Sequence, residues 1–339
     1  MKSLVIISNE KFFLDENNYY CDNLDMKSTP EELSNFNDIL LICRKFSIKR
    51  AFKVDQNKIK LSLNSNIFSF LISIFKTLKI KNDYLVFSLT PYTFLSILFL
   101  SIFRKNIFVY LRSDGYEEYY SKLGISGKII YGIIFNISSV LTNMISCSKK
   151  ILRGKKGEIV FPSQLNSKWF IKNNNKIDFE PKLLYVGRIK KEKGVFSLID
   201  IIKKDNSISL TIVGATEEKE LVAEANNIKI LKLETNIEKL IDLYDNHSIF
   251  ILPSFTEGHP MVLLESLARH KPVIVFDDLS HIVGQYKGVF LCKRNINSLR
   301  NCINHINKNY FDIIELISTN KLPTKKEFIM SLEKAISKK

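Results

Sequence analysis

The chain has few cysteines, and none of them is placed to form a structural site. Its five cysteines lie far apart, and no two form a C-x-x-C pair. A disulfide framework and a zinc site are therefore not expected, and the pattern fits a reducing cytoplasm. The N-terminus MKSLVIISNEKFF lacks the small-residue cleavage site of a secretory signal, so we interpret it as a first strand.

The sequence also lacks the signatures of a nucleic-acid-binding protein. It contains no arginine-rich tract, RNP-like motif or Cys/His finger spacing, so nucleic acid is not an expected partner. Yet the formal net charge is +15, which suits an anionic partner such as a phosphorylated small molecule or a lipid surface. The alternative is a general Lys and Asn bias, because the lysines are spread widely along the chain.

Two uncharged stretches have the length of a membrane span. Residues 84–103 and 129–148 each contain no charged residue. Thr90-Pro91 interrupts the first, and Asn136 and Asn143 interrupt the second. A strand–turn–helix and a helix–turn–strand explain both stretches without burying amides in lipid. The aromatic-containing segments 68–78 and 92–103 are expected to join the core, with docking on anionic lipid as the alternative.

Short apolar runs alternate with helical patterns along most of the chain. The runs are rich in Val, Ile and Leu with little polar alternation, as in strands that helices cover on both faces. The 339 residues, 45% of them apolar, are enough for two cores. We therefore expect an α/β protein with two Rossmann-like, doubly wound parallel-sheet domains. The expected strands are 4–7, 39–43, 85–88, 107–111, 144–146, 159–161, 183–186, 210–213, 228–231, 249–252, 273–276 and 289–291.

A change in composition marks a domain boundary. Residues 166–182 (NSKWFIKNNNKIDFEPK) carry an Asn/Lys run and a proline, and we interpret them as a linker. The prediction is an N-terminal domain over 1–165, a C-terminal domain over 183–320, and a basic helix over 321–339 that packs back toward the N-terminal domain. Ligand is expected in the cleft between the domains, beyond the carboxyl ends of the strands.

The first ligand-binding pattern follows the strand predicted at 183–186. Gly187 lets the backbone approach a ligand, Arg188 offers a planar fork for phosphate oxygens, and Lys193 lies near a helix N-terminus that attracts anions. A P-loop is not matched. A solvated basic loop is the alternative interpretation. Gly214, after the strand 210–213, starts a second exit loop that faces a nucleotide or makes an ordinary tight turn.

The second pattern is PSFTEGHPMVLLESLARHKPVIV, residues 253–275. Pro260 suits the first position of a helix that Met261 continues. The backbone N–H groups of Gly258, His259, Met261 and Val262 then point outward with the positive end of the helix dipole, which suits a diphosphate. His259 itself either contacts the donor or caps the helix.

Two carboxylates flank this helix start. Glu257 precedes it, and Glu265 lies about 7–8 Å along the axis from Pro260, at about 1.5 Å per residue. Carboxylates accept hydrogen bonds from vicinal hydroxyls, whereas phosphates need donors. The spacing therefore suits a nucleotide-sugar, which has hydroxyls at both ends and negative charge between them. A surface pair on an ordinary helix is the alternative.

These motifs together resemble a known enzyme family. VGRIKKEKG (186–194), LTIVG (210–214) and LPSFTEGHPMVLLESLARHKPVIV (252–275) are similar to the retaining glycosyltransferases of family 4, which have the GT-B fold. The resemblance is strong over about 150–300 and continues weakly through MISCSKKIL and IVFPSQLNSKWF.

The resemblance implies roles for the motif residues. Arg188 and Lys193 would bind the donor diphosphate, Glu257 the donor sugar and Glu265 the ribose, while the backbone of 258–262 would hold phosphate. It also implies that no metal ion and no cofactor are essential, with a nucleoside-diphosphate sugar as co-substrate.

The acceptor side departs from the family pattern. The N-terminal half contains no histidine, although many relatives carry one at a strand exit. Asp114, after the strand 107–111, is the best candidate for an acidic partner near the acceptor hydroxyl. A helix cap is an equal alternative for this carboxylate.

The sequence thus predicts a cytoplasmic retaining glycosyltransferase, peripheral on the inner face of the membrane. It would move a hexose-type sugar from a UDP- or GDP-linked donor to a saccharide acceptor. The resemblance suggests a lipid-linked acceptor and the synthesis of a bacterial surface polysaccharide, as lipopolysaccharide or capsule. The alternatives are a GT-B sugar-nucleotide 2-epimerase and a non-catalytic basic scaffold that binds membrane or nucleic acid.

Overall fold

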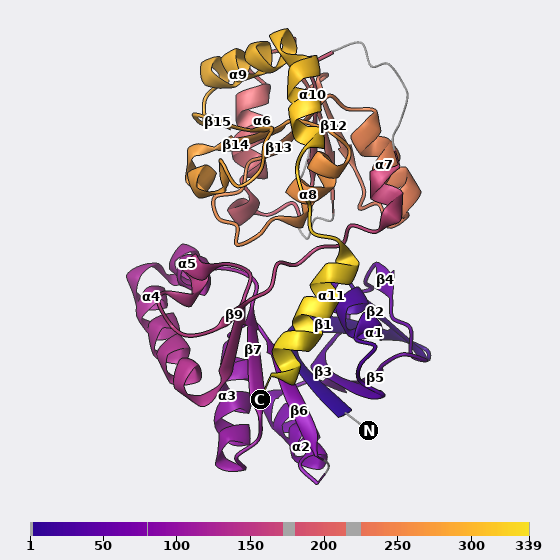
Figure 1. The fold of residues 1–339 in the computed structure, drawn as a ribbon, viewed down its shortest axis with the longest axis vertical. Helices are drawn as coiled ribbons and strands as arrows, with labels where there is room; N and C mark the ends of the chain where they lie inside the picture. Colours follow the sequence, from indigo (N-terminus) through magenta and orange to yellow (C-terminus); the bar gives the residue numbers. More distant parts are fainter. Residues whose placement is uncertain (1–2, 80, 172–179, 215–224, 339) are drawn as a thin grey trace. The chain divides into compact units, whose positions relative to one another are not determined.

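The chain divides into two compact units, each with its own sheet. A computed structural model describes residues 3–79, 81–171, 180–214 and 225–338. Met1–Pro162 and Lys325–Lys339 form the N-terminal unit, and Ser163–Thr324 form the C-terminal unit (Figure 1). Each unit is described by itself below.

The N-terminal unit is built on a mixed sheet that is mostly parallel. Its strand order is β4-β2-β1-β6-β7-β8-β9, and β3 pairs with β1 and β5. Only the pairs that involve β2 are antiparallel among the described strands. The strands are β1 (Ser3–Asp15), β2 (Asn18–Cys21), β3 (Asp38–Phe46), β4 (Phe52–Lys53), β5 (Lys60–Asn64), β6 (Asn82–Phe87), β7 (Ile107–Leu111), β8 (Asn143–Ser146) and β9 (Glu158–Ile159).

Helices cover both faces of this sheet. One core cluster joins the sheet to α2 (Ile67–Thr77), α3 (Pro91–Ile102), α4 (Gly115–Leu141) and the short α5 (Lys149–Leu152). The other joins it to α1 (Leu24–Glu32) and α11 (Lys325–Ser337). Asn35 donates to both carboxylate oxygens of Glu333, at 2.8 and 2.7 Å, and this bond fixes α11 to the N-terminal unit.

The C-terminal unit has the strand order of a dinucleotide-binding fold. Its sheet runs β12-β11-β10-β13-β14-β15, with every described pair parallel. The chain order reverses between β10 and β13, which creates a topological switch point. The strands are β10 (Lys182–Val186), β11 (Ser209–Val213), β12 (Ile228–Leu231), β13 (Ile249–Leu252), β14 (Val273–Phe276) and β15 (Val289–Cys292).

Short helices connect these strands. They are the α-helices α6 (Val195–Ile202), α7 (Ile237–Asp245), α8 (Met261–Ala268), α9 (Ile296–Lys308) and α10 (Tyr310–Ser318), and the 3₁₀ helices η1 (Ser167–Phe170), η2 (Lys191–Lys193) and η3 (Asp277–Ile282). The helices α6 and α7 have apolar stripes that join the sheet in one core.

The predicted architecture of two Rossmann-like units is confirmed. The predicted C-terminal strands match the observed ones to within one residue. Both long uncharged stretches are also a strand joined to a helix, as expected. The sequence reading missed β2, β4 and β5, and it ended β1 too early. The end of β1 and β2 form a hairpin, in which Phe13 to Asp15 pair with Asn18 to Tyr20. The polar residues in its turn interrupt the apolar pattern by which a strand is predicted.

The boundary between the units differs from the predicted linker 166–182. Residues 172–179 lie outside the described residues, but Trp169 is 2% exposed and belongs to the C-terminal core. Its ring packs edge-on against Tyr244, with centroids 5.5 Å apart. Arg269 Nη1 donates to the Trp169 carbonyl at 3.0 Å, and its Nε and Nη2 donate to the buried carboxylate of Asp245 at 2.8 and 2.7 Å. This network explains why the C-terminal unit starts before its first strand.

We predict that Arg269→Met destabilises the C-terminal unit by about 3–5 kcal/mol, because the buried Asp245 loses its paired charge. Urea unfolding followed by the fluorescence of Trp169, the single tryptophan, measures this change. The matched control is Arg300→Met, which removes the Asp205 pair of a half-exposed arginine and should cost below about 1 kcal/mol. Equal losses in the two variants would contradict the prediction.

Candidate active site

The predicted donor-binding motifs meet at the carboxyl edge of the C-terminal sheet. The exit loops of β10 and β13 flank the switch point, where open α/β sheets bind their ligands. The two loops are joined directly, because Phe255 N–H donates to the Glu192 carbonyl at 3.1 Å. Residues that are 64 positions apart in the chain thus share one site.

Glycines permit this close approach of loop to loop. Gly194 has φ 66°, and a Cβ added there would lie 1.9 Å from the Pro253 carbonyl oxygen. A Cβ at Gly214 would lie 1.8 Å from the Gly187 carbonyl oxygen. Gly214 therefore allows its loop to pack against the backbone of Gly187. The sequence had suggested a loop that faces a nucleotide or makes an ordinary tight turn. Ala215 and Thr216, in the same predicted loop, lie outside the described residues.

Lys193 and Glu257 form the ionic centre of the site. Lys193 Nζ lies 2.7 Å from Glu257 Oε1, and both side chains are largely buried. Ser254 Oγ donates to the same carboxylate oxygen at 2.7 Å. The sequence reading did not select Ser254, although it stands in the same motif, because a serine after a strand usually makes an ordinary turn.

Arg188 lies exposed on the exit loop of β10, which also carries Lys193. The Tyr185 hydroxyl donates to its carbonyl at 2.8 Å, which fixes the backbone at this point. Within the residues that the structure describes, the Arg188 guanidinium forms no ion pair. Its charge is therefore available to an incoming anion.

The helix start at Pro260 differs by one residue from the prediction. Pro260 is the N-cap of α8, with φ −75° and ψ 111°, and Met261 is the first helical residue. Proline has no side-chain acceptor, so no side chain caps this end. The N–H groups at Met261 and Val262 therefore belong to an uncapped first turn, which favours an anion.

Two histidines lie beside Glu257. Burial lowers the pKa of His259 to about 4, so its ring is neutral at pH 7. His281 Nε2, from η3, lies 3.3 Å from the Glu257 carbonyl oxygen. The His281 side chain is exposed.

Glu265 is a buried carboxyl on the first turns of α8. It is 8% exposed, and the Tyr244 hydroxyl donates to its Oε2 at 2.8 Å. Burial raises the pKa of Glu265 to about 7. The sequence reading missed Tyr244, because nothing in the apolar stripe of α7 distinguishes a tyrosine that binds a carboxyl group from one that only packs.

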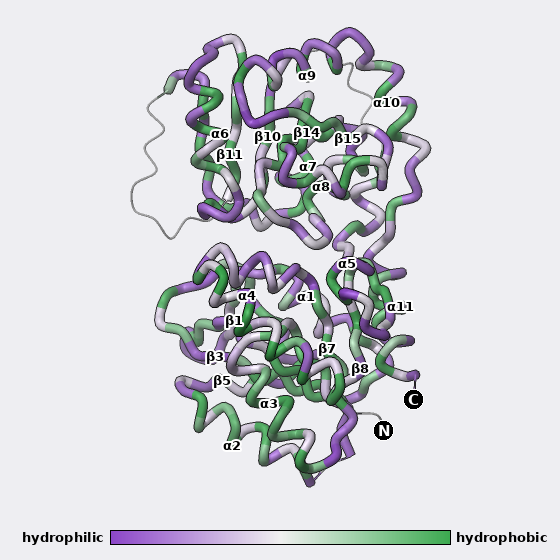
Figure 2. The backbone as a smooth tube through the Cα atoms, turned by 90° about the vertical axis from the view of Figure 1, so that its left-hand side faces the viewer, coloured by the Kyte–Doolittle hydropathy of each residue, from purple (hydrophilic) through white to green (hydrophobic). Residues whose placement is uncertain are grey.

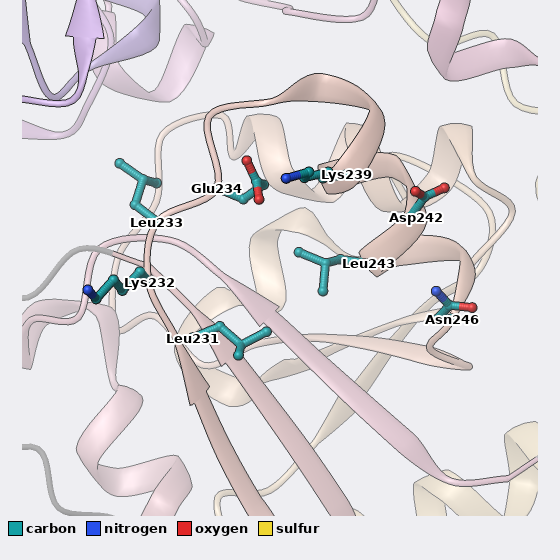
Figure 3. Close-up of a pocket in the computed structure, with 8 residues that line it drawn as sticks. All are labelled: Leu231, Lys232, Leu233, Glu234, Lys239, Asp242, Leu243 and Asn246. Carbon is teal, nitrogen blue, oxygen red and sulfur yellow. The ribbon is translucent and has the colours of Figure 1, made fainter.

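A groove of about 410 Å³ lies between the end of β12 and α7 (Figure 3). Leu231, Leu233 and Leu243 form its apolar part, and charged groups such as Glu234 and Lys239 surround them. Leu243 is the neighbour of Tyr244, so α7 contributes to both the groove and the Glu265 site. This C-unit groove has the apolar floor and polar rim of a small-molecule site.

The N-terminal unit has a pocket of about 310 Å³ at the carboxyl ends of β6 and β7. It is lined by Asn9, Ser88, Leu89, Thr90, Pro91, Leu111, Ser113, Gly115, Glu118, Tyr119, Lys122, Leu123 and Tyr131. We name it the N-unit pocket. The acid on its wall is Glu118, which the sequence reading did not select.

Asp114 lies beside this pocket but is not among its lining residues. Its carboxylate accepts from Tyr116 N–H at 3.1 Å and so caps α4. It also pairs with Arg153 at 3.4 Å. The capping alternative describes the observed contacts, and a catalytic role for Asp114 stays a prediction.

Within the described residues, no group of three or more His, Cys, Asp or Glu side chains is arranged to hold a metal ion. The positive charge at the site comes from Arg188, Lys193 and the α8 N-terminus.

The chain is similar to known proteins in sequence and in fold. Residues 167–320 match the family described as glycosyl transferases group 1. The O-antigen biosynthesis glycosyltransferase WbnH of Escherichia coli is 30% identical over 162 residues, which are 44% of this chain and 46% of that protein. The N,N'-diacetylbacillosaminyl-diphospho-undecaprenol alpha-1,3-N-acetylgalactosaminyltransferase of Campylobacter jejuni is 30% identical over 137 residues, 38% and 36% of the two chains. The chain thus matches less than half the length of these curated relatives.

The similarity in fold extends further than the similarity in sequence. The crystal structure of Anabaena Alr3699/HepE in complex with UDP-glucose has a TM-score of 0.69 and 14% identity, covering 99% of this chain and 98% of that one. This likeness shows the GT-B fold for both units. The match to the glycosyl transferases group 1 family, over residues 167–320, includes the Lys193–Glu257 site.

Proposed function

We propose that the protein is a retaining glycosyltransferase that transfers a hexose-type sugar from a UDP- or GDP-linked donor. The single observation that carries the proposal is the contact of Lys193 with Glu257 at the uncapped start of α8. A cation, a carboxylate and free helix N–H groups at a switch point match the parts of a nucleotide-sugar.

The donor diphosphate would lie between Arg188, Lys193 and the first turn of α8. As the bond from the sugar to the diphosphate breaks, negative charge grows on the departing oxygens. Cationic groups that are already in position stabilise this charge without reorganisation. Lys193 also orients the Glu257 side chain, so that its carboxylate can accept hydrogen bonds from the sugar hydroxyls.

The nucleoside would occupy the other side of α8. Glu265 would accept the ribose hydroxyls through the oxygen that Tyr244 does not hold, and the C-unit groove would take the base. An ionised carboxylate accepts hydrogen bonds on both oxygens, whereas a carboxylic acid donates from one of them. Nucleotide binding therefore favours the ionised form of Glu265.

The acceptor hydroxyl belongs to a saccharide in this proposal. The N-unit pocket combines hydroxyls, an amide and Glu118 with the aromatic rings of Tyr119 and Tyr131, and sugars suit such a mixture of polar and apolar faces. We propose a lipid-linked acceptor of a bacterial surface polysaccharide, as the name of the Campylobacter jejuni relative suggests. The protein would then act in the cytoplasm, on the inner face of the membrane.

We predict that Lys193→Ala and Glu257→Gln each lower kcat/KM for donor turnover by about 10²–10³. The donor is the UDP- or GDP-sugar that raises the melting temperature of the wild type most, and the measurement is release of nucleoside diphosphate with acceptor present. Lys191→Ala is the matched control, because Lys191 is an exposed cation on the same turn. Full activity in the Lys193→Ala or Glu257→Gln variant would overturn the assignment.

Glu265 predicts a pH dependence of stability. Its pKa is about 7 in the folded unit and about 4.5 when unfolded, so the folded state retains a proton that the unfolded state releases. Glu265 should therefore contribute a fall of about 3 kcal/mol to the free energy of unfolding as pH rises from about 4.5 to 7, levelling off above that, while the lowered pKa of His259 contributes a rise over about 4 to 6.5 in the wild type and in Glu265 variants alike. Urea unfolding followed by Trp169 fluorescence at several pH values measures it. Glu265→Gln should remove this fall, and an unchanged slope in that variant would refute the role of Glu265.

We predict that transfer persists in excess EDTA, because Arg188, Lys193 and the α8 N-terminus supply the positive charge at the diphosphate. Activity is compared with and without Mg²⁺ after chelation. A loss of more than about tenfold that Mg²⁺ restores would mean that the fixed cations are insufficient.

A further inference from the structure

The outer face of the α2–α3–α4 layer is apolar, although no described residue of the N-terminal unit covers the exposed side chains on it. More than half of the large apolar side chains that the described residues expose lie on these helices and at Phe103. Phe68 on α2, Ile102 on α3 and Val140 on α4 are 76%, 76% and 81% exposed. Helices at the surface of a soluble domain normally turn polar residues outward. We call these exposed residues the apolar face: Phe68, Ile72, Phe75, Leu95, Ile102, Phe103, Leu123, Ile125, Ile129, Ile130, Ile133, Ile137, Val140 and Leu141.

The helix α4 shows the contrast most clearly. Its buried side, which includes Tyr131, Phe135 and Ser138, packs on the sheet. Its opposite side carries Ile133 and Val140, which are exposed. The helix is the one in the described residues that is long and apolar enough to cross a membrane. Because one side is packed against the protein, α4 is suited to lie along a bilayer surface.

The three helices form one continuous layer. The rings of Phe75 on α2 and Phe99 on α3 lie 6.4 Å apart, and Phe99 also contacts Phe103 at 5.1 Å. The helices α3 and α4 pack against each other as well. Both α2 and α3 are strongly hydrophobic along their length (Figure 2). The apolar face is thus a single patch, larger than scattered surface residues would make.

Cations outnumber acids around the apolar face, where α4 carries Glu117, paired with Lys128, and Glu118 in its first turn. The sequence contains no Asp or Glu over 56–82, 84–113 or 119–157. The same segments carry exposed cations, among them Lys76, Lys79, Arg104 and Lys122. None of these four forms an ion pair within the part of the chain that the structure describes. An apolar patch bordered by unpaired cations complements a bilayer of anionic phospholipid, whereas a contact between two copies would bring these cations together.

We infer that the apolar face seats the protein on an anionic bilayer, with α4 lying in the interfacial plane. The side chains of Ile133 and Val140 enter the acyl boundary, while the lysines meet the headgroups. Lys122 and Leu123 also line the N-unit pocket. The pocket therefore opens beside the bilayer, where a lipid-linked acceptor would reach it, and this last step rests on the proposed function.

Vesicle sedimentation tests the inference without any enzymatic readout. The probe is a vesicle of phosphatidylglycerol and phosphatidylcholine, compared with phosphatidylcholine alone. The wild type should bind the anionic vesicles at least about tenfold more tightly, and Ile133→Glu with Val140→Glu should reduce that binding at least about tenfold. Both positions are exposed, and circular dichroism checks that the variant stays folded.

Met330→Glu is the matched control. Met330 is 59% exposed on α11, which covers the opposite face of the same sheet, so vesicle binding should not change. The inference is overturned if the wild type ignores anionic vesicles, or if the control loses as much binding as the double variant. If the wild type does not bind vesicles but forms a dimer that the double variant does not form, the apolar face is a contact between two copies instead. Failure of donor turnover with vesicle binding intact would contradict only the proposed function.

Discussion

The ion pair of Lys193 and Glu257 is the constraint on which the candidate site depends. It joins two loops that leave different strands, and it exists only because Gly194 allows the backbone to pass against the Pro253 carbonyl. The same pair holds the Lys193 ammonium group in a largely buried position. Solvent would screen the charge of a mobile surface lysine more strongly. In the absence of a donor each charge satisfies the other. A bound donor would then compete with the pair: its diphosphate would interact with Lys193, and its sugar hydroxyls would donate to Glu257.

Glu265 and Tyr244 show how the surrounding core supports this edge. Tyr244 packs between Trp169 and Phe250, so its hydroxyl has one position from which to donate. Burial with a single donor raises the pKa of the Glu265 carboxyl to about 7. In the proposed function, a bound polyol would supply further hydrogen bonds to this carboxyl group, which would link ligand binding to ionisation. The Trp169 carbonyl in turn accepts a hydrogen bond from Arg269, which pairs with Asp245. The same buried network therefore stabilises the C-terminal unit and fixes the position of Tyr244 beside Glu265.

The N-terminal unit is specialised in a different way. Its two faces carry helices of contrasting character: α11 presents polar residues outward, whereas α2, α3 and α4 present isoleucine, leucine and phenylalanine. Asp114 stabilises the start of α4 as a cap, and Glu118, one turn further along, lines the N-unit pocket. Capping and pocket lining are thus divided between two acids on successive turns of the same helix.

The sequence by itself determined the two α/β units, most strands and the motif residues Arg188, Lys193, Glu257 and Glu265, because hydrophobic periodicity and strand-exit glycines are local signals. It could not show that Trp169 joins the C-terminal core or that Tyr244 binds Glu265, since both contacts join distant segments. Nor could it separate the two sides of α4, because apolar side chains such as Tyr131, Ile133, Phe135 and Val140 lie on both sides and do not indicate which one the sheet covers. Tertiary structure decided these points: which groups are buried is a property of the packed chain, and burial sets both the pKa of Glu265 and the exposure of the apolar face.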